Sequence, residues 1–539
     1  MSPSSLFQEG EAGPATPVEQ LAGGLAQGVL QCVIGLALGV LAAALMRRAR
    51  VHWSWAAVTV GLVLLLRSSL TVPSTTLVFA AACAAILARR GQRREMEAGG
   101  DLAARAGASS TPLDAARAIA RAVTERGSAG SGVQRALRGG ELALGRDERG
   151  RSVTVPFGAR DGSHVLVVGA TGSGKTVTQT WIAACAIEHG RAAIVVDPKG
   201  DEGMFGEICN AAGRAGRRVL RWTPHGAVVY NPYARGSETE IADRLLAGER
   251  FTEPHYQRQA QRYLGHAVRA LRACGGEVSL HAIVEQLDPE ALERLTRELP
   301  EGGGEATQAY LDSLTTRQRG DLAGVRDRLA ILAESDVGPW LDPRTPDAER
   351  FDLLGAVRAR DVVYLDLEAD SRPLVAEMLG AAIVQDLQST VAALQGRPQP
   401  TLVVIDEFSA VAAEQVVRLF NRARSAGFSL LLGTQELADL RLPGRERLLE
   451  QVMGNLSVLV AHRQVVPRSA ELIAEIAGTR AAWRVARHSD GRSTRTRSRE
   501  GVLDRDRLMD LAPGWGAVLA LGCGRPARIA RIFSPGQDR

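Results

Sequence analysis

The chain has 539 residues, which is too long for one ordinary hydrophobic core, so we expect two or more folded units. It is 45% hydrophobic and 23% charged with a formal net charge of +5, a balance that permits an acidic partner without requiring one. Six cysteines without paired spacing and nine histidines without an H-E-x-x-H pattern argue against a disulfide framework and against a zinc site.

Residues 1–20 form an acidic tail, and residues 21–94 are predicted to lie in a membrane. Leu21 to Met46 carries no charge over 26 residues, and a helix of that length spans roughly 39 Å, enough to cross a bilayer. Two further apolar runs follow at 51–66 and 68–87, between arginine clusters that should stay cytoplasmic. We predict two to three spans, with three spans and an external N-terminus preferred. A shallow middle hairpin and a buried hairpin of a soluble domain are the alternatives.

This region predicts a multi-pass protein of the cytoplasmic membrane, in contact with membrane lipid and with its remaining domains in the cytoplasm. Residues 95–140 are rich in Ala, Gly, Ser and Arg, a composition typical of a linker. The membrane region is therefore separate in sequence from the part of the chain that carries the chemical motifs.

A glycine-rich loop follows an apolar strand expected at 165–168, in the stretch HVLVVGATGSGKT. A helical pattern begins after the loop, and strand, loop and helix together are the setting of a phosphate-binding P-loop. The glycines let backbone N–H groups converge on an anion, and the helix directs the positive end of its dipole at the same point. We therefore predict that ATP binds to Gly169, Ala170, Thr171, Gly172, Ser173, Gly174, Lys175 and Thr176.

Lysine occurs at two positions in the whole chain, Lys175 and Lys199, and the other 63 of the 65 basic residues are arginine. An ammonium is nearly a point charge, whereas a guanidinium is a broad planar fork, so only lysine fits inside a backbone loop wrapped around phosphate oxygens. We predict that Lys175 contacts the β- and γ-phosphates and that the hydroxyl of Thr176 binds Mg²⁺. A plain glycine turn is the alternative.

The stretch TLVVIDEFSA predicts a buried strand at 401–405 that ends in two acids, Asp406 and Glu407. Acids at the carboxyl end of a parallel strand face the ligand crevice. We predict that Asp406 holds Mg²⁺ through water and that Glu407 orients and deprotonates the attacking water. A merely polar strand end is the alternative.

Another apolar strand, FSLLLGTQ, ends in Gln435, whose amide could sense the γ-phosphate. Arg424 comes just before this strand, at the end of a helix expected at 414–426, and is a candidate arginine finger for the site of a neighbouring subunit. Arg422 is the competing choice. A solvated arginine at a helix end is equally compatible with the local sequence.

The stretch RAAIVVDPKGD predicts one more buried strand, with Asp197 and Lys199 just beyond its end. In a parallel sheet this loop would lie beside the P-loop, so both residues are candidate nucleotide contacts. The role of Lys199 stays open between a phosphate contact, an adjoining surface and an ordinary turn.

Lys175 and Asp406 are 231 positions apart (406 minus 175), more than a bare nucleotide-binding core requires. The excess lies at 237–342, where apolar residues recur at helical spacing and strand patterns are missing. We predict an α/β nucleotide-binding domain in two parts, 141–236 and 343–535, interrupted by an all-α domain at 237–342.

Residues 484–500, RVARHSDGRSTRTRSRE, hold many arginines without an evident period. A solvated loop is the simpler interpretation. A loop that reaches into a nucleic-acid channel is the other, because phosphate contacts need only mobile cations.

In order and spacing, these motifs resemble the conjugative coupling proteins of type IV secretion, the TraG/TraD type. The likeness covers roughly residues 141–533 and rests on HVLVVGATGSGKT, VVDPKGD, VVYNPYARG, VVIDEFS, RSAGFSLLLGTQ and MGNLSVLVAHR. It implies a RecA-like P-loop NTPase with an inserted all-α domain and N-terminal transmembrane helices, assembled as a homo-hexamer. It also favours Arg424 over Arg422 as the trans-acting finger and makes Gln435 the γ-phosphate sensor.

The resemblance implies a membrane-anchored ATPase that uses ATP and Mg²⁺ to move DNA, as a single strand with bound relaxase, to a type IV secretion channel in conjugation. Its partners would be DNA, relaxase or relaxosome proteins and channel components, with the helical domain contacting DNA or a relaxase complex. The alternatives are a double-stranded DNA translocase of the FtsK/SpoIIIE type, an ATPase that powers protein export without DNA, and a membrane receptor that uses ATP as an assembly switch.

Overall fold

The structure is a computed structural model that describes residues 17–48, 76, 80–87, 136–158, 162–249, 251, 253–300, 302–411, 413–441, 447–487 and 493–535. The chain divides into two compact units. The larger unit is Ser131–Thr479 with Gly501–Arg539, and the smaller unit is Met1–Gly130 with Arg480–Glu500. The larger unit contains every motif of the predicted nucleotide site.

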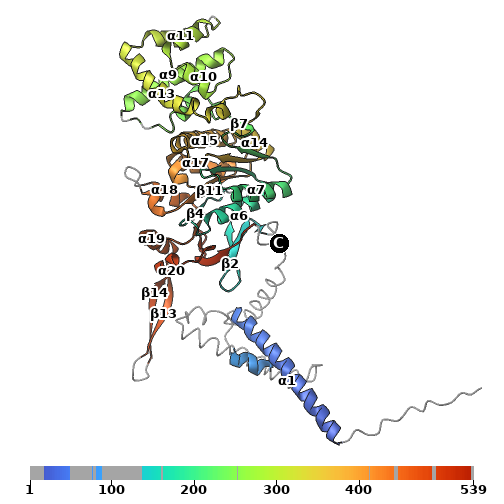
Figure 1. Ribbon diagram of the computed structural model, residues 1–539. Coiled ribbons are helices and arrows are strands. Elements are labelled where there is room, and N and C mark those ends of the chain that lie inside the picture. Colours follow the sequence, from blue (N-terminus) through green and yellow to red (C-terminus); the bar gives the residue numbers. More distant parts are fainter. Residues whose placement is uncertain are drawn as a thin grey trace, which may run out of the picture. The chain divides into compact units, whose positions relative to one another are not determined.

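A sheet of twelve strands, counted over the described residues, forms the centre of the larger unit (Figure 1). Seven adjacent strands among them run parallel. Every residue of β4, β5, β9, β10 and β11 is buried, because parallel strands are covered on both faces and their sequences are continuously apolar. In spatial order the parallel strands are β12 (Val458–Ala461), β4 (Val165–Val168), β11 (Phe428–Thr434), β10 (Thr401–Ile405), β5 (Ala192–Asp197), β9 (Val362–Asp366) and β6 (Val219–Trp222).

An antiparallel extension widens this sheet beyond β12. It consists of β15 (Trp515–Ala520), β16 (Arg528–Ile532) and β2 (Glu141–Asp147), with β1 (Leu137–Arg138) and β3 (Ser152–Pro156) both paired to β2. The strands expected at 165–168 and 401–405 correspond to β4 and β10. The predicted α/β class is confirmed.

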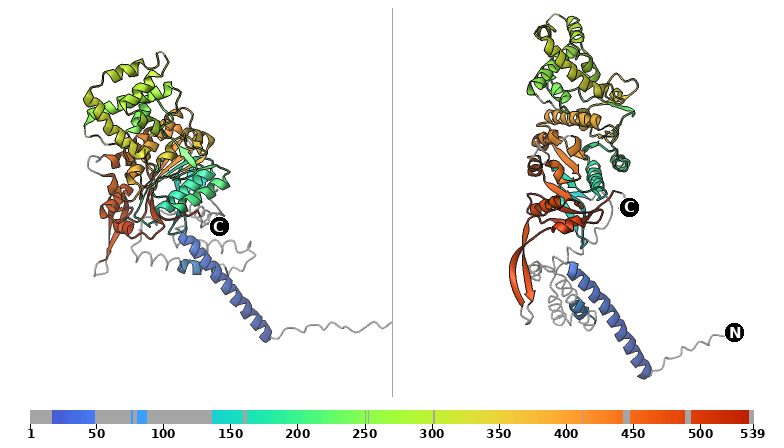
Figure 2. Two further views of the ribbon diagram at one scale, coloured as in Figure 1. Left: turned by 45° about the horizontal axis from the view of Figure 1, so that its top comes forward. Right: turned by 60° about the vertical axis from the view of Figure 1, so that its left-hand side comes forward.

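Helices cover both faces of the parallel strands (Figure 2). α6 (Lys175–Glu188) and α7 (Glu202–Arg214) pack against one set of alternate strand residues, which includes Val165 and Val167. The other set, which includes Leu166 and Val168, packs against α14 (Leu353–Ala359), α15 (Pro373–Ala393) and α17 (Ala413–Ala423). The two-residue period of each strand therefore divides the core into two layers.

A helical insertion lies between β7 (Val228–Tyr230) and β8 (Glu349–Phe351), two short strands that pair in parallel. Capping boxes at Ser237 and Thr315 start two of its helices. The described residues of 237–342, the range predicted to be all-α, contain no strand. The elements of the insertion, green to yellow in Figure 1, are α8 (Glu238–Leu245), α9 (Pro254–Ala273), α10 (Leu280–Glu285), α11 (Pro289–Arg297), α12 (Glu305–Asp312), α13 (Thr316–Ala333) and the 3₁₀ helix η3 (Gly338–Leu341).

Short elements complete the larger unit. One of them leads from α17 into β11 through Gly427, whose φ is 83° and where an added Cβ would lie 2.9 Å from the carbonyl oxygen of Gln399. Only glycine allows this turn, which fixes where β11 begins. The elements are α16 (Phe408–Val411), η4 (Arg424–Ala426), η5 (Leu437–Leu440), α18 (Leu448–Asn455), α19 (Pro467–Ala477) and α20 (Arg505–Met509).

The smaller unit contains α1 (Pro17–Arg48) and a helical segment at 80–87, which approach each other through small residues. A Cβ at Gly39 would lie 2.7 Å from Cβ of Cys83 and 2.8 Å from the carbonyl oxygen of Ala80, so glycine is what permits this approach. The other sides of α1 expose large apolar side chains, namely Val29, Leu30, Val33, Ile34, Leu36, Leu38, Val40 and Leu41.

None of the helices in the described part of the chain combines the length and the apolar character that a membrane crossing needs. The predicted spans within 21–94 are therefore not confirmed. The second apolar run, 51–66, and residues 68–75 of the third lie outside the described residues, as do residues 1–16 of the acidic tail and 95–135 of the linker.

Two strands, β13 (Thr479–Arg487) and β14 (Ser493–Gly501), pair as a separate two-stranded sheet, which we call the arginine ribbon. The prediction of an irregular loop at 484–500 is wrong for the described residues. The strand period was present in the sequence, since Arg495, Arg497 and Arg499 alternate with threonine and serine as residues on one face of a strand do. Arg497 and Arg499 are exposed.

Candidate nucleotide-binding and hydrolysis site

The predicted site residues gather at one edge of the parallel sheet. β4, β11, β10 and β5 are paired in register, so they end at nearly the same level. The residues that follow their ends are neighbours, and they are the P-loop, Gln435, Asp406 with Glu407, and the turn that contains Lys199. This edge, at the carboxyl ends of the strands, is where open α/β sheets bind ligands.

The start of α6 forms a cradle for an anion. Its N-cap Gly174 has a φ of 108° and Gly172 has a φ of 73°, left-handed conformations that glycine adopts at little cost. No side chain caps the helix and its first turn holds no acid, so the N–H groups of that turn stay available. These donors and the positive end of the helix dipole favour a phosphate at this point.

Backbone contacts with distant segments hold the P-loop in shape. The N–H of Ala170 donates to the carbonyl of Arg463 at 3.0 Å, and the carbonyl of Ser173 accepts from the N–H of Gly514 at 2.9 Å. A Cβ at Gly174 would lie 3.1 Å from the same backbone nitrogen of Gly514, so the loop packs directly against backbone.

His462 supports the P-loop and was not predicted from the sequence. Its ring lies 2.8 Å from Oγ1 of Thr178 through Nε2 and 2.9 Å from the carbonyl oxygen of Trp515 through Nδ1, and it is fully buried. Burial lowers the pKa of His462 to about 4, against the opposing effect of the Trp515 carbonyl, so the ring is neutral at physiological pH. A signal existed, because His462 follows a buried strand, β12, as Gln435 follows β11.

Lys175 and Glu407 form the centre of the site. The ammonium of Lys175 donates to Oε1 of Glu407 at 2.5 Å, and the lysine side chain is 7% exposed. The same oxygen accepts from Nζ of Lys199 at 2.9 Å and from Nε2 of Gln435 at 3.1 Å. Four residues predicted for this site, from four separate segments, therefore meet at one atom.

The two lysines set the charge state of Glu407. Burial alone would raise the pKa of Glu407, but the hydrogen bonds and charges of Lys175 and Lys199 outweigh it and hold the pKa below its ordinary value. Burial would likewise lower the pKa of Lys199, and the hydrogen bond and charge of Glu407 raise it instead. The φ of Glu407 is 44°, a left-handed conformation of the kind that clusters at functional sites.

Asp406 carries an orphaned polar atom that suits a cation. Its Oδ1 and both amide atoms of Gln179 are buried without a hydrogen-bond partner, and so is Oγ of Ser173 in the P-loop. Burial raises the pKa of Asp406, the charge of Lys175 opposes this, and the neighbouring Glu407 adds to it. A cation next to Oδ1 would supply the missing partner and keep the carboxylate ionised.

The site fits Mg²⁺ delivered with a nucleotide. Mg²⁺ is usually held by one or two carboxylates together with phosphate oxygens and water. In the described residues no group of three or more His, Cys, Asp or Glu side chains is arranged to hold a metal ion. Asp406 and the partly buried Thr176, in the first turn of α6, are the residues that would hold the ion.

The carboxylate of Asp197 is bonded to the turn that carries Lys199 and to Tyr364. Its Oδ1 accepts from the N–H of Lys199 at 2.9 Å, and its Oδ2 accepts from the N–H of Asp201 at 2.6 Å and from the hydroxyl of Tyr364 at 2.5 Å. Both oxygens shape the turn that carries Lys199, and the predicted nucleotide contact of Asp197 stays a prediction. Tyr364 comes from β9, so no local pattern could have revealed this role.

Arg424 lies away from the site of its own chain. It precedes β11 whereas Gln435 follows it, and the seven residues of the strand put about 20 Å between the two ends. The exposed guanidinium of Arg424 donates to the carbonyl of Asn455 at 2.7 Å. Arg422, the competing choice, is also exposed and lies in the last turn of α17, on the same side of the strand. Neither arginine can reach the P-loop of its own chain.

Two family models match the chain, and between them they cover both halves of the site. The model described as the TraM recognition site of TraD and TraG matches residues 400–513, which include Asp406 and Glu407. The model described as the central domain of helicase HerA matches residues 142–336, which include the P-loop. Together the two matches support a conjugative coupling protein of the TraG/TraD type. The chain is an ATP-hydrolysing P-loop enzyme.

Solved structures share the fold of this chain. The bacterial conjugative coupling protein TrwBdeltaN70, in an unbound form, aligns with a TM-score of 0.55 at 17% identity, over 74% of this chain and 90% of that chain. VirB4 of Thermoanaerobacter pseudethanolicus aligns with a TM-score of 0.50 at 16% identity, over 74% and 97% of the two chains. TrwB has also been solved with ADP and Mg²⁺ and with a non-hydrolysable ATP analogue.

A sequence relative comes from Mycoplasma pneumoniae (strain ATCC 29342 / M129 / Subtype 1). It is an uncharacterized protein that is 30% identical over 104 residues, which are 19% of this chain and 69% of the relative. Because this relative is uncharacterized, the match assigns no activity to the chain.

For an ATP hydrolase, the arrangement assigns tasks to the residues on the page. The P-loop amides and Lys175 would bind the β- and γ-phosphates, since an ammonium has three donors and Glu407 uses one of them. Glu407, ionised and held by three donors, would orient the attacking water and take its proton. Mg²⁺ bound through Asp406 and Thr176 would reduce the charge on the phosphate oxygens.

We predict that Gly433→Ala weakens Mg²⁺-dependent binding of a non-hydrolysable ATP analogue. An added Cβ at Gly433 would overlap with Oδ1 of Asp406 and Nε2 of Gln179, so the carboxylate would have to leave the position that we assign to the metal. Titration calorimetry with and without Mg²⁺ measures this.

Gly454→Ala is the matched control, because no atom lies within 4 Å of a Cβ added there. It should bind the analogue like the wild type. Unchanged Mg²⁺-dependent affinity in Gly433→Ala would contradict the assignment of Asp406 to the metal site.

Proposed function

We propose that the chain is a membrane-anchored, hexameric ATPase that couples ATP hydrolysis to the movement of DNA, as a single strand with bound relaxase, toward a type IV secretion channel in conjugation. The observation that carries the proposal is the position of Arg424, about 20 Å from its own hydrolysis site along β11. If Arg424 is the arginine finger, it must act on the site of a second chain.

A closed ring gives every site such a neighbour. A head-to-tail contact sets one patch of each chain against a different patch of the next, and it forms a ring when the rotation closes. Two such patches lie at opposite ends of the parallel strands. Arg424 is at the amino end of β11, and the P-loop is at the carboxyl end of β4. Hydrolysis at each interface would then depend on the position of the adjacent chain.

The arginine ribbon supports DNA as the cargo. Arg497 and Arg499 occupy alternate positions of β14, about 6.6–6.8 Å apart on one face. No acid interrupts this row between Ser493 and Arg499. Cations in a row contact phosphates without regard to base sequence, as a motor that moves along DNA requires.

The family matches support a role in conjugation. The model named for TraM recognition covers residues 400–513, and this range is our candidate for the surface that binds a relaxosome protein. The coupling protein TrwB and VirB4 share the fold, which suits an ATPase that serves a secretion channel. The helical insertion at 237–342 is our candidate for contact with DNA or with a relaxase complex.

Membrane anchoring is supported by the N-terminal region. The run from Leu21 to Met46 carries no charge, and α1 exposes eight large apolar side chains among its described residues, a surface that suits lipid better than water. We propose that this region lies in the cytoplasmic membrane and that the larger unit works in the cytoplasm.

We predict that Lys175→Ala and Arg424→Ala variants are each inactive alone and restore ATP turnover when mixed. In a randomly mixed ring, half of the chains have an intact P-loop, and half of these face a neighbour with an intact finger. About a quarter of the wild-type rate should therefore return. Steady-state ATPase assays of each variant and of a 1:1 mixture after reassembly measure this. A mixture as inactive as its components would contradict a finger shared between chains, and Arg422→Ala in place of Arg424→Ala tests the competing choice.

We predict that single-stranded DNA stimulates ATP turnover and that Arg497→Ser with Arg499→Ser weakens DNA binding. Each phosphate contact on a single strand contributes about 0.7 to the slope of log affinity against log salt, so the double variant should lose about 1.4 from that slope. Fluorescence anisotropy at several salt concentrations measures the slope.

The matched control for the ribbon is Arg149→Ser with Arg528→Ser, which removes two exposed arginines from the larger unit. It should keep the wild-type slope. Stimulation by double-stranded DNA alone would favour a duplex translocase. Turnover that ignores DNA and rises with a secreted protein would sink the proposal of DNA movement.

We predict that the full chain sediments with the membrane fraction and resists alkaline extraction, whereas residues 95–539 remain in the supernatant. The physical reason is the apolar surface of the N-terminal region. Recovery of the full chain in the supernatant after ultracentrifugation would contradict membrane anchoring.

A further inference from the structure

The two lysines of the chain end on the same atom. Of 65 basic residues 63 are arginine, yet the cations on Oε1 of Glu407 are the ammonium groups of Lys175 and Lys199. An ammonium is a compact point charge, whereas a guanidinium is a broad planar fork, so two lysines fit beside one another on this oxygen more easily than two arginines would. The contact that Lys199 shares with Lys175 is a physical reason for lysine at position 199.

The turn that carries Lys199 is built to fix this contact. The N–H of Lys199 donates to Asp197, which is 1% exposed and is itself held by the hydroxyl of Tyr364. The next residue, Gly200, has a φ of 71°, and a Cβ there would lie 2.8 Å from Oδ1 of Asp366. The backbone on both sides of Lys199 is thus constrained, while its side chain is 42% exposed.

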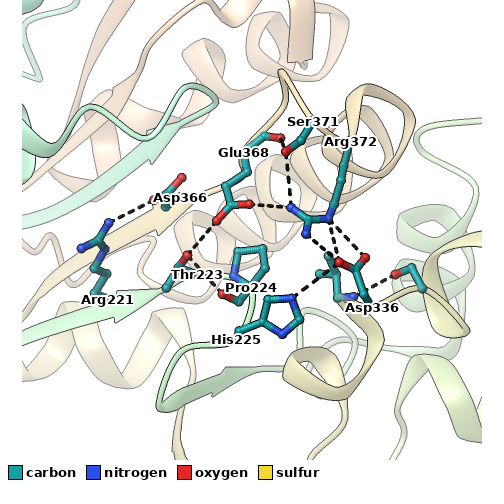
Figure 3. A network of polar contacts seen from close by, with 11 residues as sticks. Arg221, Thr223, Pro224, His225, Asp336, Asp366, Glu368, Ser371 and Arg372 are labelled. Atoms are coloured by element: carbon teal, nitrogen blue, oxygen red, sulfur yellow. Dashed lines mark hydrogen bonds and ion pairs between the residues drawn. The ribbon is translucent and has the colours of Figure 1, made fainter.

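The same turn is bonded to a second turn that touches the helical insertion. The carbonyl of Pro198 accepts from the N–H of Ala369 at 2.6 Å. Three residues later Arg372, the N-cap of α15, donates through Nη2 to Asp336 at 2.6 Å and through Nη1 to Glu368 at 2.5 Å (Figure 3). Asp336 follows α13 of the insertion, so two ion pairs of Arg372 and the backbone hydrogen bond of Ala369 connect the insertion with the turn of Lys199.

We propose that Lys199 is a positioning residue for Glu407, and that the turn it sits in transmits the position of the helical insertion to that carboxylate. When a nucleotide binds, its phosphate oxygens compete with Glu407 for the three donors of Lys175. The hydrogen bonds from Lys199 and Gln435 then remain to hold Oε1 of Glu407. The other carboxylate oxygen is then aimed at the attacking water. The proposal concerns ATP hydrolysis and does not depend on what the motor moves.

Lys199→Met in the full chain tests the first half. We expect kcat for ATP to fall about 10- to 100-fold, the effect of a misplaced catalytic group, while the Kd of a non-hydrolysable ATP analogue with Mg²⁺ changes by less than about twofold. A merely structural defect would move both. Lys199→Gln, which keeps a donor, serves as a second variant if Lys199→Met does not fold, and Arg149→Met is the control for loss of an exposed cation.

Two outcomes would overturn the positioning role. Wild-type kcat in Lys199→Met would show that Glu407 does not need this contact. An affinity loss as large as the loss of kcat would make Lys199 a phosphate ligand instead. The absence of any ATP turnover in the wild-type chain would be a failure of the enzyme assignment, and the binding arm would still report on Lys199.

Arg372→Met tests the second half through a double-mutant cycle. Alone it should lower kcat by about 2- to 30-fold without changing analogue affinity, and combined with Lys199→Met it should cause no further loss, because both variants break one path. Arg297→Met, which removes an exposed ion pair with Glu293 within α11 of the insertion, is the matched control and should leave kcat unchanged. If the fold-losses in kcat of the two single variants multiply in the double variant, Arg372 and Lys199 act independently and the proposed coupling is wrong.

Discussion

One carboxylate oxygen organises the hydrolysis site: Oε1 of Glu407 accepts from Lys175, Lys199 and Gln435 at 2.5, 2.9 and 3.1 Å. Glu407 is largely buried, and a buried carboxylate that faces two cations is stable only if the geometry is tight. Compact ammonium groups suit this shared contact, and the only two lysines of the chain supply them. The rest of the larger unit can be understood as the frame that brings these side chains to one point.

That frame is the in-register parallel sheet. Because β4, β11, β10 and β5 end together, the P-loop, the glutamine, the acids and the lysine turn meet without long excursions of the chain. The same geometry explains why Arg424 is far from the site of its own chain. A residue at the amino end of β11 is separated from the site by the length of the strand. In the proposed ring, Arg424 would therefore serve the site of a neighbouring chain.

Much of this could be predicted because two local rules apply. Buried parallel strands are continuously apolar, and ligand residues follow their carboxyl ends, which locates Asp406, Glu407 and Gln435 from the sequence alone. Roles that depend on a partner from another strand escaped prediction: Asp197 is turned to its own loop by Tyr364, and His462 braces α6 through Thr178. The strands of the arginine ribbon were not predicted, because the alternation of arginine with threonine and serine is too short to distinguish a strand from an irregular loop. The membrane region rests on composition, and the described helices do not confirm it.

The measurement that tests this account most directly is nucleotide binding and turnover of Glu407→Gln in the same preparation. The amide keeps the shape of the side chain and removes the charge and the proton acceptor. The account predicts that ATP with Mg²⁺ still binds with an affinity near that of the wild type, while turnover falls by about 10²–10⁴-fold, the usual contribution of a general base. Turnover near the wild-type rate would contradict the central role of the Glu407 carboxylate.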